Sequence, residues 1–320
     1  MNDSSRSPCT AKDRILAVAQ LMRLANVFTA MADVWMGFVL VWGTLQPIIV
    51  SLGLTLCSCL LYTAGMVLND VADAKVDAVE RPERPIPSGK VSLWFAQCLG
   101  WSLLLAGVLV GFCMSFLNNS AAAGFIAWGL CVMIVAYNSW LKHTWLGPFA
   151  LATCRAGNIL LGMSPFIIQM GPFGFFFLDI PFAPSIGIAC YVCGFSFFAR
   201  EEHAPERRGL LVVGLIFVAC GFAILATAPW WEFAASRLIV PAWQWLAFWV
   251  VLAGTVLRRF FLAAGQPTPK NVQHAVGYAI LLLIPMNAAL VWGYAGWEWA
   301  AVVLALLAPA KILSRWLRVT

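Results

Sequence analysis

Long apolar runs constrain this chain more than any other feature of its sequence. Ten runs approach or exceed the length needed to cross the roughly 30 Å hydrocarbon core of a bilayer. They occupy residues 20–43, 47–68, 92–117, 121–141, 147–170, 182–199, 210–229, 241–262, 274–294 and 297–313. Only 11% of the residues are charged, against about 25% in soluble domains. The sequence therefore predicts an all-α, polytopic membrane protein of nine or ten transmembrane helices.

The ends of the apolar runs predict how the chain is oriented. Residues 1–14 are polar and basic and are expected to form a cytoplasmic tail, and residues 15–320 a single transmembrane domain. Lys and Arg are concentrated in alternate connections, and Arg237 alone falls in the opposite set. By the positive-inside rule, the amino terminus and the longer polar loops face the cytoplasm. We expect a multi-pass protein of the cytoplasmic (inner) membrane.

Carboxylates are clustered after the second apolar run, in Asn69–Lys90, which reads NDVADAKVDAVERPERPIPSGK. Five of the fourteen carboxylates of the chain lie there. If the helix continues past Asn69, then Asn69, Asp70, Asp73, Asp77 and Glu80 share an arc of about 100°. Like charges three and four residues apart repel, so a cation is expected on this face.

The composition of this cluster favours a hard divalent ion. Oxygen ligands without sulfur or imidazole suit Mg²⁺, which is usually held by one or two carboxylates, waters and substrate phosphates. The prolines after Arg81 end the helix and fix a turn that carries Arg84 and Lys90. These cations could neutralise the remaining charge of a polyphosphate. A solvated interfacial loop is the simpler alternative.

Other polar residues mark a possible cavity. A second charged cluster, from Arg200 to Arg208, follows the sixth run and contains Glu201, Glu202 and Glu206. Polar side chains within apolar runs are costly in lipid and usually face a partner or a cavity. They are Arg23, Asn26, Asp33, Tyr137, Asn138, Lys142, Arg155 and Asn158. For Arg155, two interpretations stay open: an ion pair with a buried carboxylate, or a contact with a ligand.

At this point the motifs resemble a known family. Asn69–Gly89 resembles the first aspartate-rich motif, NDxxDxxxD with a basic RP-rich turn, of the UbiA superfamily of intramembrane prenyltransferases. RLANVFTAMADVWMG, YNSWLK, Gly147 and RAGNILLG match other parts of the family pattern in the right order. The second motif departs from the family's Asp-Arg-Glu-Asp-Asp string, because Ala199–His203 reads AREEH.

The resemblance implies a helical bundle around a central cavity that transfers a prenyl group from an isoprenoid diphosphate with Mg²⁺. Its implied catalytic residues are Asp70, Asp73, Asp77 and Lys142. Its implied substrate-binding residues are Asn26, Asn69, Arg81, Arg84, Tyr137, Arg155, Asn158 and Arg200. Its implied metal ligands are Asp70, Asp73, Asp77, Glu201, Glu202 and Glu206.

We therefore expect Mg²⁺-dependent prenyl transfer to an unidentified acceptor within the lipid bilayer. Two alternatives remain at this point: a membrane terpene cyclase of the same fold, which the altered second motif motivates, and a transporter of an amphipathic phosphorylated ligand. A cyclic product without added acceptor would indicate the cyclase, and flux without turnover the transporter. No nucleic-acid partner is expected.

Overall fold

A bundle of long helices forms the protein in the computed structural model, which describes residues 10–170, 174–177, 181–201, 208–231 and 238–317. The α-helices are α1 (Ala11–Leu21), α2 (Leu24–Trp42), α3 (Ile48–Ala72), α4 (Ala74–Glu80), α5 (Leu93–Leu117), α6 (Ala122–Ser139), α7 (Gly147–Met163), α8 (Phe182–Ala199), α9 (Arg208–Trp231), α10 (Ala242–Gly265), α11 (Pro269–Ala295), α12 (Trp297–Ala305) and α13 (Leu307–Trp316). Short 3₁₀ turns, η1 (Leu141–His143) and η2 (Ser164–Phe166), flank α7.

Within these described residues, nine helical segments are long and apolar enough to cross a membrane. The 17-residue α7 accompanies them inside the bundle, so the predicted count of nine or ten is confirmed. One correction concerns a helix end. The fifth span was expected to reach residue 170, but α7 ends at Met163 because Pro165 cannot continue the helix. Residues beyond it form an antiparallel pair of short strands, β1 (Ile167–Met170) and β2 (Gly174–Phe177).

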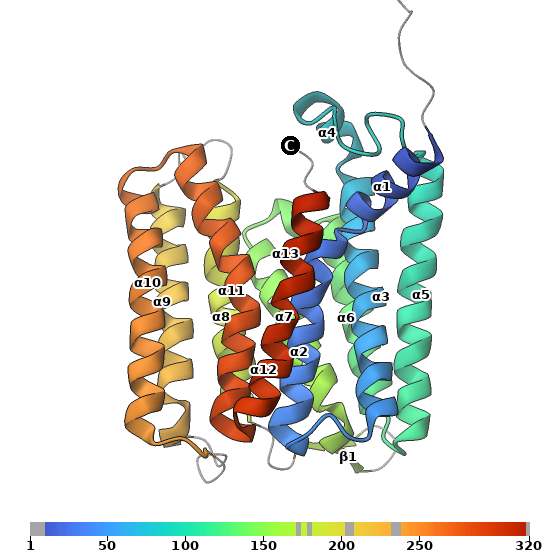
Figure 1. The fold of residues 1–320 in the computed structure, drawn as a ribbon. Coiled ribbons are helices and arrows are strands. Elements are labelled where there is room, and N and C mark those ends of the chain that lie inside the picture. The colour runs from blue at the N-terminus through green and yellow to red at the C-terminus, as the bar shows by residue number, and fades with distance from the viewer. Residues whose placement is uncertain (1–9, 171–173, 178–180, 202–207, 232–237, 318–320) are drawn as a thin grey trace, which may run out of the picture.

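The helices stand side by side, with α9 and α10 at one edge and α5 at the other (Figure 1). Different elements lie at the two ends of the bundle: α1, α4 and the end of α13 at the upper end, and β1 at the lower end. Thr10 caps α1 by accepting a hydrogen bond from the Asp13 backbone N–H, so the helix begins inside the predicted polar tail. Between α1 and α2, Arg23 adopts left-handed backbone angles (φ 47°, ψ 46°).

Close backbone contact between α2 and α7 closes the lower part of the bundle. A Cβ added to Gly37 would come within 2.4 Å of the Ile159 carbonyl oxygen, and one added to Gly162 within 2.3 Å of the Val34 carbonyl oxygen. Small residues allow such an approach in lipid, where helices associate by packing rather than by a hydrophobic driving force. The backbones of α2 and α7 are therefore in direct contact at Gly37 and Gly162.

A first prediction tests this contact. Gly162→Ala is expected to destabilise the protein by about 1–3 kcal/mol, because the added methyl group must push α2 and α7 apart. Gly129→Ala is the matched control, since Gly129 lies on an exposed surface of α6 with no heavy atom within 4 Å of its would-be Cβ. Thermal unfolding of the purified variants in detergent gives the melting temperature of each. Equal melting temperatures for the two variants would contradict the prediction.

Candidate active site

The acidic stretch after α3 is a helix with one break. α3 ends at Ala72, and Asp73 takes bridge-region backbone angles (φ −87°, ψ 0°) before α4 begins at Ala74. The continuous helix predicted through Glu80 is therefore wrong at one residue, although α4 does end at Glu80, directly before Arg81 and Pro82. Helical hydrogen bonds continue across the break, from the Asp73 N–H to the Asn69 carbonyl oxygen and from the Asp77 N–H to the Asp73 carbonyl oxygen.

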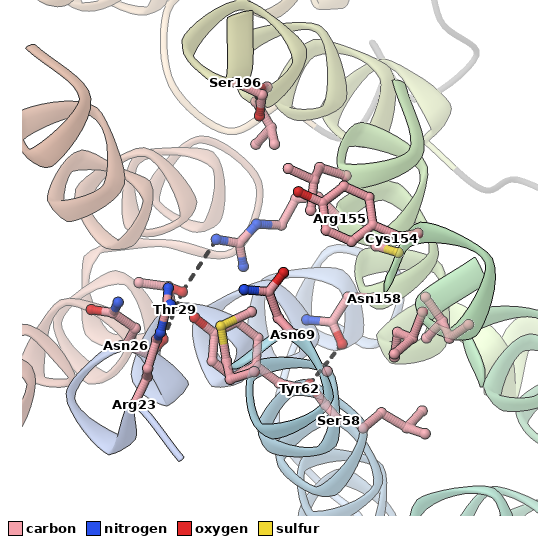
Figure 2. Close-up of a pocket in the computed structure, with 18 of the residues that line it drawn as sticks. Arg23, Asn26, Thr29, Ser58, Tyr62, Asn69, Cys154, Arg155, Asn158 and Ser196 are labelled. Atoms are coloured by element: carbon pink, nitrogen blue, oxygen red, sulfur yellow. Dashed lines mark hydrogen bonds between the residues drawn. The ribbon is translucent and has the colours of Figure 1, made fainter. Parts of the chain in front are cut away.

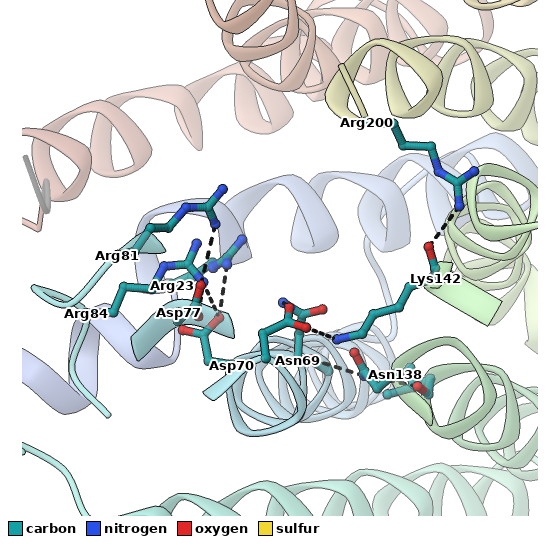
Figure 3. A network of polar contacts seen from close by, with 12 residues as sticks. Arg23, Asn69, Asp70, Asp77, Arg81, Arg84, Asn138, Lys142 and Arg200 are labelled. Carbon is teal, nitrogen blue, oxygen red and sulfur yellow. Dashed lines mark hydrogen bonds and ion pairs between the residues drawn. The ribbon is translucent and has the colours of Figure 1, made fainter. Parts of the chain in front are cut away.

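Two carboxylates meet on one side of this segment. Asp70 and Asp77 are both buried, and the Arg84 guanidinium lies between them (Figure 3). Arg84 Nη1 is 2.6 Å from Asp77 Oδ2 and 3.5 Å from Asp70 Oδ1. Arg23 Nη2 also donates to Asp70 Oδ1 at 3.1 Å, and Arg81 Nη1 lies 3.9 Å from Asp77 Oδ1. A shared cation thus already holds these two carboxylates together.

Asp73 belongs to a second group that faces η1. The Lys142 ammonium forms a close ion pair with Asp73 Oδ1, and the Asn69 amide donates to Asp73 Oδ2 at 3.1 Å. Lys142 is nearly buried, with 8% of its side chain exposed. Arg200, which follows α8, donates to the carbonyl oxygens of Lys142 (2.8 Å) and Thr144 and so ties the end of α8 to η1 (Figure 3).

The second acidic cluster is described only in part. Glu201 is buried, with 5% of its surface exposed, directly after Arg200. Glu202 and Glu206, which were predicted as metal ligands, lie outside the described residues.

The donor set of the first motif fits a hard cation. In the part of the chain that the structure describes, no three His, Cys, Asp or Glu side chains lie close enough together to hold a metal ion. Asp70, Asp73 and Asp77 each contact Arg or Lys instead. Oxygen donors from Asp70, Asp73 and Asp77 suit Mg²⁺, which commonly uses few protein ligands and completes its shell with phosphate and water.

A cavity of about 300 Å³ opens below these groups. Arg23, Asn26, Asn69 and Tyr137 lie at its upper end, and Ser58 and Asn158 line its inner end. Ser58 precedes Asn69 by eleven residues on α3, which corresponds to about 16 Å along a helix. A second hollow of about 370 Å³ lies beside the first and is lined by Asp70, Arg81 and Arg84 and by Ser314 of α13. Arg23 and Asn26 line both spaces.

The inner end of the cavity is polar because of a buried ion pair. Arg155 Nη1 of α7 lies 2.5 Å from Asp33 Oδ2 of α2, and none of the Asp33 side chain is exposed. Asn158 donates to the same oxygen at 3.2 Å, and Asn287 of α11 donates to Asp33 Oδ1 at 2.7 Å. Ser58 of α3 donates to Asn158 Oδ1 at 2.6 Å. Three helices, α2, α7 and α11, therefore meet at one carboxylate, and α3 joins them through the bond from Ser58 to Asn158.

Most of the predicted residues are placed around these spaces. Asn26, Asn69, Tyr137, Arg155 and Asn158 line the cavity. Of the two interpretations of Arg155, the ion pair with a buried carboxylate is confirmed by its contact with Asp33. Arg155 also lines the cavity, and its contact with a ligand stays a prediction. Arg200 supports η1.

Some residues of this region received no specific role from the sequence. Arg23 and Asp33 were singled out only as charges within the first apolar run. Tyr62 could have been found by its spacing, because it precedes Asn69 by seven residues and so shares its helix face. Asn287 offered no signal, because nothing in the sequence relates it to Asp33, 254 residues away.

The chain is similar in sequence to known membrane prenyltransferases. The family model of the UbiA prenyltransferase family matches residues 30–200. A digeranylgeranylglyceryl phosphate synthase of Methanoregula boonei is 35% identical over 285 residues, covering 85% of this chain and 94% of the relative. One of Methanoculleus marisnigri is 32% identical over 149 residues, covering 46% and 51%. For this and a Saccharolobus solfataricus relative, the matched part spans about half of the relative's length.

Solved structures share the fold. A structure described in connection with digeranylgeranylglyceryl phosphate synthase superposes with a TM-score of 0.63 at 17% identity, covering 88% of this chain and 99% of the other. A UbiA homologue from Archaeoglobus fulgidus bound to DMAPP and Mg²⁺ superposes with a TM-score of 0.56 at 12% identity, covering 90% and 99%. The bundle described above is thus similar to theirs over almost its whole length.

Proposed function

Because the chain belongs to the UbiA prenyltransferase family, we propose that it transfers a prenyl group from an isoprenoid diphosphate to an acceptor within the membrane, with Mg²⁺ as cofactor. One observation carries the proposal. Three carboxylates and four cationic side chains surround the mouth of a cavity between apolar helices. Such a site can hold a charged diphosphate at the membrane boundary and its hydrocarbon chain in an apolar space.

Asp70, Asp73, Asp77 and the Asn69 amide are the groups that would hold the metal. When bound, Mg²⁺ would neutralise charge on the diphosphate and help it to leave. The cations that now contact these carboxylates would then be available to the phosphate oxygens. Arg84 and Arg23 beside Asp70, and Lys142 beside Asp73, already lie at the mouth and need to move little. Arg is well suited to this exchange, because its planar fork binds carboxylate and phosphate alike.

The bond changes define what the remaining residues must do. The C1–O bond of the allylic diphosphate breaks with both electrons passing to the diphosphate, whose new charge the cations at the mouth stabilise. The acceptor nucleophile forms a bond to C1 and loses a proton. The developing positive charge on the prenyl carbon needs aromatic faces and little water, and Tyr62, Tyr137 and Phe195 line the cavity.

Orientation in the membrane belongs to the same proposal. We place the end that carries α1, α4 and the end of α13 in the cytoplasm, on the basis of the Lys and Arg distribution. The diphosphate would then enter from the cytoplasm, where water-soluble prenyl diphosphates can reach the mouth.

The test uses purified protein with labelled prenyl diphosphates of several chain lengths. Geranylgeranylglyceryl phosphate is the first acceptor to try, because the relatives are named as synthases of digeranylgeranylglyceryl phosphate. We expect diphosphate release and a prenylated product, with a fall of at least about 100-fold when EDTA removes Mg²⁺, since metal stabilisation is worth several kcal/mol. Re-addition of Mg²⁺ should restore the rate.

The same assay separates the alternatives. Release that is unaffected by EDTA would contradict the role of Mg²⁺, and no release with any donor and acceptor would contradict prenyl transfer. A cyclic hydrocarbon formed without acceptor would replace the proposal by a terpene cyclase.

A further inference from the structure

The inner end of the cavity contains a hydrogen-bond donor that is only partly used. Two of the five N–H groups of Arg155 are engaged, by Asp33 at 2.5 Å and by Thr29 Oγ1 at 3.2 Å. Among the described residues, the structure gives no partner for the others. The side chain is 12% exposed, and it lines the cavity. Figure 2 shows it reaching from α7 across the cavity towards Thr29 on α2.

Unpaired N–H groups on a largely buried side chain are costly, because little water can take the place of the missing partner. Both oxygens of the Asp33 carboxylate are engaged by contrast, because Arg155, Asn158 and Asn287 all donate to it. The Tyr62 hydroxyl also lines this space, and no described residue bonds to it. Both groups would be satisfied by an oxygen atom of a bound molecule.

The charges around the inner end of the cavity determine whether a neutral or an anionic oxygen of a bound molecule is preferred there. Asp33 of α2 and Arg155 of α7 neutralise each other. The other cavity-lining residues at this level come from α2, α3, α6, α7, α8 and α11 and are uncharged. Arg23, the other charged lining residue, lies at the mouth and is paired with Asp70. An anionic group placed beside Arg155 would therefore leave a net negative charge in a low-dielectric environment, which is strongly unfavourable.

We propose that the inner end of the cavity is a binding subsite for a neutral oxygen, a hydroxyl or carbonyl group, of the prenyl acceptor, with the Arg155 guanidinium as its donor. That the bound molecule is the prenyl acceptor rests on the proposed function. The preference for a neutral over an anionic oxygen rests only on the pairing of Arg155 with Asp33. The aromatic side chains of Tyr62, Tyr137 and Phe195 in the cavity wall suit a flat ring.

Two probes of nearly the same shape test the charge preference. 4-Hydroxyacetophenone carries a neutral carbonyl where 4-hydroxybenzoate carries a carboxylate at pH 7. We expect calorimetric titration of the purified protein to show saturable binding of the ketone, at least about 10-fold tighter than binding of the carboxylate. Arg155→Met should weaken binding of the ketone about 10-fold or more, as expected for loss of a hydrogen bond from a charged donor.

Asp33→Asn gives the sharper outcome, because it leaves Arg155 with an uncompensated positive charge. The preference should then invert, so that the carboxylate probe binds more tightly than the ketone. Glu298→Gln is the matched control, since it makes the same change in charge at an exposed position on α12 and should leave the ratio unchanged.

If Asp33→Asn does not fold, the ratio of the affinities for the ketone and the carboxylate in the unmodified protein still decides the proposal. Equal binding, tighter binding of the carboxylate, or no binding of either probe would overturn it. Failure of the proposed function is seen separately, as absence of diphosphate release in the turnover assay.

Discussion

Asp70→Asn is expected to lower the rate of Mg²⁺-dependent diphosphate release about 100- to 1,000-fold. Removal of one group that stabilises charge in a transition state typically has an effect of this size. Asp70 has two proposed roles. It is a proposed metal ligand, and its carboxylate also positions Arg23 (3.1 Å) and Arg84 (3.5 Å), which would bind the leaving diphosphate. Steady-state assays with a labelled prenyl diphosphate measure the change.

Glu80→Gln is the matched control for this experiment. Glu80 lies on the neighbouring helix α4 and is exposed, so its loss makes the same change in charge outside the site. We expect its rate to remain within a factor of about two, because surface substitutions usually have small effects. A similar loss of rate in both variants would indicate a general electrostatic effect of the loop rather than a specific role of Asp70.

Arg155→Met is expected to destabilise the protein by about 3–5 kcal/mol, because it leaves the Asp33 carboxylate buried without its cation. The double variant Asp33→Asn/Arg155→Met should recover most of this loss. The double variant leaves no buried charge, and the asparagine oxygen can still accept one of the two hydrogen bonds that Asn158 and Asn287 now donate to different oxygens of Asp33. Unfolding of the purified variants in bicelles or detergent measures the free energies, and the double-mutant cycle gives the coupling between the two residues.

Arg315→Met provides the comparison, since it replaces an exposed arginine of α13 by the same residue. Its stability should change by about 0.5 kcal/mol or less. If the double variant were as unstable as Arg155→Met alone, Asp33 and Arg155 would not act as a pair, and the account of the inner end of the cavity would be wrong.

The helices were predictable from sequence because hydrocarbon thickness and apolar length are directly related. α5 was expected over 92–117 and forms over Leu93–Leu117. The end of α7 was missed although Pro165 was a visible signal, because the apolar run continues past it without interruption. The break at Asp73 had no such signal, since no proline or glycine marks it. It falls at Asp73, which pairs with Lys142, whereas Asp70 and Asp77 on either side of it share Arg84.

Only those site residues that lie together in one short segment were predictable from the sequence. Asn69, Asp70, Asp73 and Asp77 fall in a short string whose spacing is typical of the family. The inner end of the cavity depends on pairs that are distant in sequence, such as Asp33 with Arg155, 122 residues apart. A charge within an apolar run indicates that a partner exists, but only the packing of α2 against α7 and α11 identifies it.

The convergence on Asp33 has a consequence for biosynthesis. The ribosome produces Asp33 in the first long apolar segment, whereas Arg155 and Asn287 emerge 122 and 254 residues later. An aspartate at the centre of a helix costs about 2.5–3.5 kcal/mol on insertion into lipid. The nascent first segment therefore gains from staying beside the insertion machinery, or beside water, until α7 arrives. Assembly of the centre is complete only once α11 has been translated.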